Sequence, residues 1–125
     1  IDLLPTIAAI TGKPLPNDRK IDGMDVSGLW NGKKKKSPRK EFIHYTSRGD
    51  LEGLRSGKWK LLIKKPRRNP NNKPPEVFLF DLSKDLGEQN NLAEDKAGMV
   101  KKLRARMEAL DAEITQNARQ PWFKN

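Results

Sequence analysis

The single histidine, His44, carries the side chain with the widest choice of chemistry in this sequence. An imidazole can act as an acid, a base or a metal ligand near neutral pH. His44 lies in an expected strand, and the chain has no cysteine and no second histidine that could complete a metal site with it. We therefore favour a structural, hydrogen-bonded role for His44, and we expect no metal site within this chain.

The acidic side chains are spaced for turns rather than for catalysis. Asp81, Asp85 and Glu88 fall in the segment DLSKDLGEQNN, and Asp22 and Asp25 fall in IDGMD. At such positions a short acidic side chain accepts hydrogen bonds from nearby backbone N–H groups. The sequence also contains no glycine-rich phosphate loop and no G-x-S-x-G nucleophile motif. The residues alone predict a domain without catalytic residues of its own.

Positive charge is the other chemical feature of the chain. The sequence has 26 Lys and Arg against 16 Asp and Glu, a formal net charge of +10, which suits an anionic partner such as nucleic acid, a sulfated glycan or an acidic lipid surface. Much of the excess lies in two runs, KKKKSPRK and KKPRR, neither of which contains an aromatic residue for base stacking. We favour solvated loops and keep a polyanion site as the alternative. The candidate residues for that site are Lys33, Lys34, Lys35, Lys36, Arg67 and Arg68.

A short helix is expected at the start of the chain. Apolar residues recur at helical spacing over residues 2–11, Asp2 can cap the first turn, and Gly12 can end the helix. A loop follows, in which DVSGLWNG can form one helical turn before the basic run.

Strands and a long helix are expected in the remainder. Alternating or continuous apolar residues predict strands at 41–46, across the hairpin LEGLRSGKWKLLIK, and at 77–82. Ser56 and Gly57 are the expected central residues of the hairpin turn. From residue 95 to 117 apolar residues recur in steps of three and four. The predicted class is α+β, with three or four antiparallel strands packed against a long C-terminal amphipathic helix.

Length and composition limit the organisation. The 125 residues suffice for one domain at most, and the longest apolar runs fall far short of the roughly 20 residues that cross a bilayer. The first residue is not Met, and the chain opens in the middle of an amphipathic stretch. We therefore expect it to be part of a longer polypeptide, whose targeting signal would lie outside this sequence. The compartment cannot be read from these residues.

An ordered series of motifs resembles the C-terminal part of type I sulfatases, the arylsulfatase-like hydrolases of the alkaline phosphatase superfamily. The series runs DLLPT, IDGMDVS, KSPR, LRSGKWKLL and VFLFDLSKDLGEQNNLA, and it covers the chain from Asp2 to about Ala93. Two departures are Phe80, where that family more often has Tyr, and Leu86, where it usually has Pro. The resemblance implies that residues 1–40 are the end of a catalytic domain with its connecting loops. Residues 41–125 would be a C-terminal subdomain that borders the substrate cleft.

The resemblance also implies what lies elsewhere. Sulfatases of this type use a formylglycine made within C-x-P-S-R or S-x-P-S-R, beside a Ca²⁺ ion, and this chain has neither motif. The segment is thus expected to be non-catalytic, and its partner would be the N-terminal catalytic domain of a sulfuric ester hydrolase. The substrate of that parent enzyme would be a sulfated small molecule or glycan, and its location would be secreted, periplasmic or lysosomal. His44, Tyr45 and Arg48 are the residues that could face this substrate, because they lie at and beyond a strand end.

Two other functions stay open. A free-standing basic module that binds nucleic acid would explain the charge but not the ordered motifs, and we expect no nucleic acid partner. A non-catalytic interaction domain would differ from a sulfatase part only in what precedes Ile1. The isolated segment could also self-associate through the apolar face of its first helix.

Overall fold

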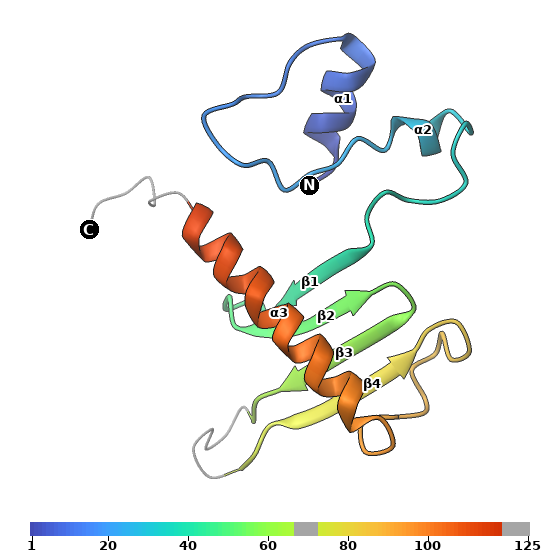
Figure 1. Cartoon of the computed structure of the whole chain (residues 1–125), viewed down its shortest axis with the longest axis vertical. Helices are drawn as coiled ribbons and strands as arrows, with labels where there is room; N and C mark the ends of the chain where they lie inside the picture. The colour runs from blue at the N-terminus through green and yellow to red at the C-terminus, as the bar shows by residue number, and fades with distance from the viewer. Residues whose placement is uncertain (67–72, 119–125) are drawn as a thin grey trace. The chain divides into compact units, whose positions relative to one another are not determined.

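The computed structural model describes residues 1–66 and 73–118, which fall into two compact units, residues 1–40 and residues 41–118 (Figure 1). Of the candidate residues, Arg67 and Arg68 lie outside the described residues. No helix in the described ranges is both long and apolar enough to cross a membrane.

The first unit contains two short helices, α1 (Leu3–Thr11) and α2 (Ser27–Trp30). Helix α1 ends as expected at Gly12, whose φ of 65° is a left-handed conformation that glycine adopts without a steric penalty. The expected cap at the other end is wrong, because the Asp2 side chain makes no capping hydrogen bond. Its carboxylate is instead bound by groups much later in the chain, as described below.

The second unit is a four-stranded antiparallel sheet covered on one face by a long helix, which confirms the predicted α+β class (Figure 1). The strands follow one another in the order β1 (Glu41–Tyr45), β2 (Leu51–Ser56), β3 (Trp59–Lys64) and β4 (Glu76–Asp81). Helix α3 (Ala97–Asn117) crosses the sheet.

One row of residues across the four strands forms the core under α3. Leu54 pairs in register with Ile43 and Leu61, and Leu61 pairs with Leu79. Leu54, Leu61 and Leu79 are fully buried, and they cluster with Leu103 and Met107 of α3. Each buried leucine contributes about 1.5–3 kcal/mol through removal of apolar surface from water, so this row is the main source of stability in the unit.

The hairpin between β2 and β3 turns one residue later than predicted. Ser56 pairs with Trp59, so Gly57 and Lys58 are the two central residues. Gly57 has φ 58°. A two-residue hairpin turn favours a positive φ at its first central position, which glycine supplies, and this preference places Gly57 there instead of Ser56.

The opposite face of β4 is also covered. Phe78 and Phe80 stack with ring centroids 6.2 Å apart, next to Leu79, which faces α3. Phe80 is buried and Phe78 is half-buried. This confirms the expectation that β4 is covered on both sides, a property of strands with continuous apolar sequence.

Candidate functional site

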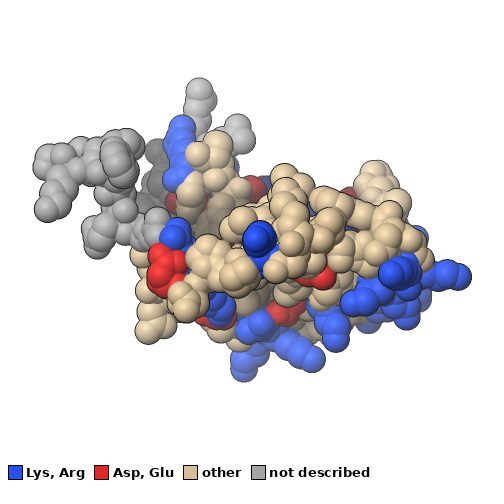
Figure 2. Space-filling view, turned by 90° about the horizontal axis from the view of Figure 1, so that it is seen from above, with Lys and Arg blue, Asp and Glu red and all other residues tan. Residues whose placement is uncertain are grey.

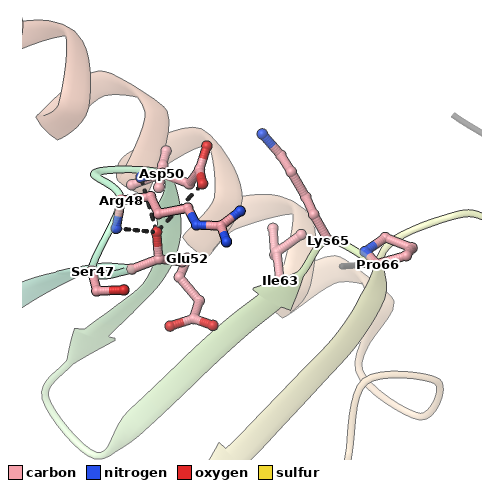
Figure 3. Close-up of a pocket in the computed structure, with 9 residues that line it drawn as sticks. Ser47, Arg48, Asp50, Glu52, Ile63, Lys65 and Pro66 are labelled. Carbon is pink, nitrogen blue, oxygen red and sulfur yellow. Dashed lines mark hydrogen bonds between the residues drawn. The ribbon is translucent and has the colours of Figure 1, made fainter. Parts of the chain in front are cut away.

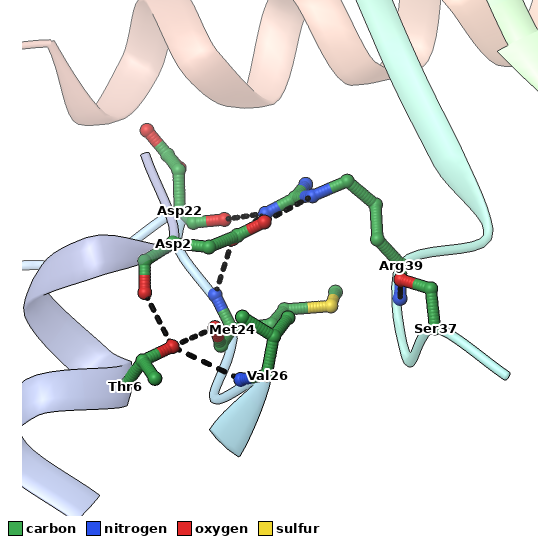
Figure 4. Close-up of polar contacts among 7 residues, drawn as sticks. All are labelled: Asp2, Thr6, Asp22, Met24, Val26, Ser37 and Arg39. Atoms are coloured by element: carbon green, nitrogen blue, oxygen red, sulfur yellow. Dashed lines mark hydrogen bonds and ion pairs between the residues drawn. The ribbon is translucent and has the colours of Figure 1, made fainter. Parts of the chain in front are cut away.

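The motifs of the first unit meet in one hydrogen-bonded cluster (Figure 4). The Oγ1 of Thr6, a fully buried residue, donates to the Asp2 carbonyl oxygen at 2.7 Å and accepts from the Val26 backbone N–H at 3.0 Å. The Asp2 carboxylate accepts from the Met24 N–H at 2.8 Å and from the Arg39 guanidinium. The hydrogen bond from Arg39 is the main reason that the pKa of Asp2 is lowered. DLLPT, IDGMDVS and KSPR therefore hold one another in place.

Close packing explains the glycine of IDGMDVS. A Cβ atom at Gly23 would lie 2.2 Å from the Ile1 carbonyl oxygen and 2.8 Å from Pro5 Cγ. Both distances are too short for any side chain, so only glycine allows this segment to approach the start of α1. Next to it, Asp25 accepts a hydrogen bond from the Ser27 N–H at 2.8 Å, as predicted for a turn aspartate.

Asp81 organises the end of β4. Its carboxylate accepts from the Lys58 ammonium at 2.7 Å and from the N–H of Ser83 at 3.1 Å. Mainly through Lys58, these contacts lower the pKa of Asp81 to about 2. The charged pair thus joins the hairpin turn to the turn after β4, which makes Asp81 a structural anion.

The rest of the acidic turn is also held from within. Asp85 accepts hydrogen bonds from the N–H groups of Gln89 and Asn90, at 3.1 and 2.8 Å. Asn91 accepts from the Leu79 N–H at 2.9 Å. The turn roles predicted for Asp81 and Asp85 are confirmed, whereas the role predicted for Glu88 is wrong. Glu88 pairs with the Lys60 ammonium at 2.5 Å, because its longer side chain reaches the sheet.

His44 and Tyr45 are adjacent in β1 but belong to different environments. His44 makes an edge-to-face contact with Phe42, with ring centroids 5.0 Å apart. Its Nε2 is buried and has no hydrogen-bond partner among the described residues, so the predicted hydrogen bond is missing at this atom. Burial is the first cause, and the charge of Lys60 the second, that lower the pKa of His44. The neutral imidazole is therefore favoured at this position.

Tyr45 is tied to the long helix. Its hydroxyl donates a hydrogen bond of 2.8 Å to the Asp111 carboxylate in α3. Near it, the Arg106 guanidinium forms an ion pair of 2.7 Å with Glu41, the first residue of β1. The edge strand of the sheet is thus fastened to α3 by two polar contacts.

Arg48 lies in the turn between β1 and β2, where it lines a hollow with Lys65 (Figure 3). The three substrate-side candidates are therefore not brought together as one site. Sequence reasoning missed Lys65, because the strand order of the sheet, rather than any local motif, brings it near Arg48.

The four lysines at the start of the basic run are exposed. Lys33, Lys34, Lys35 and Lys36 lie in a segment without regular secondary structure. Two hydrogen bonds shape its start, one from the Lys33 N–H to the side-chain Oδ1 of Asn31 and one from the Lys34 N–H to the Gly28 carbonyl oxygen. Figure 2 shows the prevalence of Lys and Arg over Asp and Glu on one face of the molecule.

The described part of the chain gathers no group of three or more His, Asp or Glu side chains suited to a metal ion. The shifted carboxylates described above are each engaged with a cation or with backbone N–H groups. The groups of this arrangement that are open to a ligand are the exposed lysines at 33–36 and the hollow beside Arg48.

Several known proteins are similar to this chain in sequence or in fold. Human arylsulfatase A is 35% identical over 142 aligned residues, which cover 92% of this chain and 27% of that protein. Human steryl-sulfatase is 32% identical over 118 residues, covering 74% of this chain and 20% of its own length. No family model matches the chain.

A solved structure has the same fold. It comes from work on glycosaminoglycan metabolism by Bacteroides thetaiotaomicron, and it aligns with a TM-score of 0.72 at 24% identity, covering 89% of this chain and 24% of that one. The chain thus spans only 20% to 27% of the two human proteins and 24% of this structure.

Proposed function

We propose, since the chain is related to the sulfatases over most of its length, that it is the C-terminal subdomain of an enzyme that hydrolyses sulfate esters. In this proposal residues 1–40 end the catalytic domain, and the sheet with α3 forms the subdomain proper. The segment supplies structure and borders the substrate cleft, while the reacting groups belong to the rest of the enzyme.

The observation that carries the proposal is the role of the sulfatase-like motifs in this structure, where their polar side chains bind other parts of the chain. Asp2 and Thr6 of DLLPT, Arg39 of KSPR and Asp81 of VFLFDLSKDLGEQNNLA each bind other parts of the chain. Groups engaged in this way stabilise loops and are not available to attack a substrate. Motifs of this kind indicate a scaffold.

The exposed apolar face of α1 is evidence that this helix packs against a larger part of the same polypeptide. Leu3, Leu4, Ile7 and Ile10 are each at least 52% exposed, on a helix of nine residues. A contiguous apolar face of this kind normally packs against protein. The two human relatives contain about three to four times as many residues outside the aligned segment as inside it. We infer that a corresponding part of the whole protein packs on this face.

The cofactors are assigned to that partner. Sulfatases require a formylglycine and Ca²⁺ in the catalytic part, and this chain carries neither modification motif. His44, Tyr45 and Arg48 remain the proposed substrate-side residues. Arg48 is the best placed of the three, because its side chain lines an open hollow while the Tyr45 hydroxyl is bound to Asp111.

The test is the coding sequence upstream of Ile1 together with an activity assay. We expect C-x-P-S-R or S-x-P-S-R upstream, and turnover of 4-nitrophenyl sulfate by the whole protein but not by residues 1–125 alone. A gene without either motif, or a whole protein without sulfatase activity, would favour the interaction domain instead. Turnover by the segment alone would contradict its assignment as non-catalytic.

A further inference from the structure

A hollow of about 520 Å³ opens where the β1–β2 turn meets the end of β3 (Figure 3). This volume lies within the range of roughly 300–1,000 Å³ that is typical of small-molecule sites. Its wall combines Arg48, Asp50 and Glu52 with Ile63 and Lys65. Two cations, two carboxylates and an apolar side chain therefore surround one space.

The turn that carries Arg48 is firmly held. Thr46 Oγ1 accepts hydrogen bonds from the backbone N–H groups of Arg48 and Asp50, at 3.2 and 3.1 Å. The Thr46 N–H donates to the Asp50 carbonyl oxygen at 2.8 Å, and Gly49 supplies a φ of 85°. These contacts fix the backbone from which the Arg48 side chain extends toward Ile63 and Lys65 (Figure 3).

The positive charges of Arg48 and Lys65 are available to bind a ligand. The side chains of Arg48 and Lys65 form no hydrogen bond or ion pair with the residues that the structure describes. Elsewhere in the sheet unit, Lys58, Lys60 and Arg106 are each paired with a carboxylate. An arginine fork and a lysine ammonium beside one hollow are the groups that bind a tetrahedral anion.

A second hollow, of about 560 Å³, continues the first. It is lined by Lys64, Lys73 and Glu76, and it shares Glu52, Lys65 and Pro66 with the hollow beside Arg48. The two hollows share part of their wall, and both are lined by cations and carboxylates. A ligand with repeating units could therefore occupy both.

The geometry points to a sulfated saccharide as the ligand, bound with a sulfate ester between Arg48 and Lys65 and with ring hydroxyls donating to Asp50 and Glu52. Carboxylates beside the cations suit a neutral, hydroxyl-rich ring that carries an isolated anion. They disfavour nucleic acid, whose closely spaced phosphates they would repel, and none of the described residues that line the hollow is aromatic, as base stacking would require. The choice of sulfate over phosphate rests on the proposed function.

The experiment is an amide chemical-shift titration of the 125-residue chain with three matched probes, glucose 6-sulfate, glucose 6-phosphate and glucose. We expect glucose 6-sulfate to shift the amides of residues 46–52 and 63–65 saturably and to bind most tightly. The variant R48Q/K65Q should weaken that binding about tenfold or more, because it removes both cations. The control variant K101Q/K102Q removes the same charge from two exposed positions in α3 and should leave the affinity unchanged.

Five results would overturn the inference. These are no saturable binding of glucose 6-sulfate, equal binding of glucose, tighter binding of glucose 6-phosphate, an equal loss in the control variant, and tighter binding of a short single-stranded DNA at the same amides. This test and the test of the proposed function can fail separately. If the whole protein hydrolyses sulfate esters but the hollow does not bind the probe, only this inference is refuted. If the hollow binds the probe but the whole protein is inactive, only the enzyme assignment is refuted.

Discussion

The guanidinium of Arg39 donates two hydrogen bonds to the carboxylate of Asp2, which lies 37 residues earlier in the chain. A third hydrogen bond, of 3.0 Å, runs from Arg39 to the Asp22 carbonyl oxygen. One side chain thus joins the start of α1, the loop before α2 and the end of the basic run KKKKSPRK. An arginine does this better than a lysine, because its planar fork can bind two acceptors at fixed angles.

Replacing Arg39 with Gln should loosen the first unit. The change leaves the partly buried Asp2 carboxylate without its cation, which costs about 1.5–3 kcal/mol for hydrogen bonds to a charged group. Amide exchange at Met24 and Val26 should accelerate, since their N–H groups bind Asp2 and Thr6 in the same cluster. Arg19→Gln is the matched control, because Arg19 pairs with its exposed sequence neighbour Asp18 and its loss should alter exchange little. Equal effects of the two variants would refute the role of the cluster.

The stability of the second unit should depend on pH through Asp81. The folded pKa of about 2 lies below the ordinary value of 3.8, so the ionised carboxylate stabilises the fold above about pH 4. This contribution is lost as the pH falls from about 4 to about 2. Asp81→Asn should be less stable than the parent chain in urea at pH 7, and the difference should vanish near pH 2.

The control for this titration is Asp95→Asn, at an exposed position before α3. Its free energy of unfolding should track that of the parent chain across the same pH range. A difference between Asp81→Asn and the parent chain that stays constant down to pH 2 would contradict the assignment.

The Tyr45 hydroxyl should stabilise the fold through its hydrogen bond to α3. Removing its hydroxyl in Tyr45→Phe deletes the hydrogen bond to Asp111 and should cost about 0.5–1.5 kcal/mol of unfolding free energy. Because the two groups are partners, the double variant Tyr45→Phe/Asp111→Ala should be less destabilised than the sum of the single variants. Strictly additive values in urea unfolding would show that the pair contributes no coupling.

The fold was largely predictable because its signals are local and periodic. Apolar residues alternate with polar ones around Leu61, and they recur in steps of three and four from Val100 to Leu110. These two patterns mark the face of β3 and the face of α3 that pack against each other, and both elements form where expected. The turn aspartates Asp81 and Asp85 were predictable for the same reason, since the N–H groups that they bind lie within five residues.

What could not be predicted depends on chain segments far apart in sequence. No pattern near Asp2 indicates Arg39, so a local capping rule assigned its carboxylate to the wrong partner. His44 was expected to be hydrogen-bonded, but its Nε2 is buried without a partner among the described residues, and the charge that acts on it from Lys60 lies 16 residues later in the chain. The Arg48 and Lys65 hollow likewise requires the strand order of the sheet.

The core row gives the largest expected effect on stability. Leu61→Ala would leave a cavity between Leu54, Leu79 and α3, and should lower the free energy of unfolding by about 2–5 kcal/mol. Leu86→Ala removes the same atoms from a side chain that is 82% exposed, and should change stability by no more than about 0.5 kcal/mol. Urea unfolding of the two variants measures both values, and similar losses would show that the row is not the core.

The basic run at Lys33 to Lys36 should behave as a solvated loop. Exposed charges without regular structure attract polyanions only weakly at physiological salt, where screening acts within about 8 Å. Heparin affinity of the chain should therefore be weak at physiological salt, and replacing the four lysines by Ser should lower it by no more per removed charge than K101Q/K102Q does. The variant K101Q/K102Q serves as the comparison for general charge removal. Strong binding at physiological salt that disappears only in the serine variant would instead identify the run as a track for a polyanionic substrate.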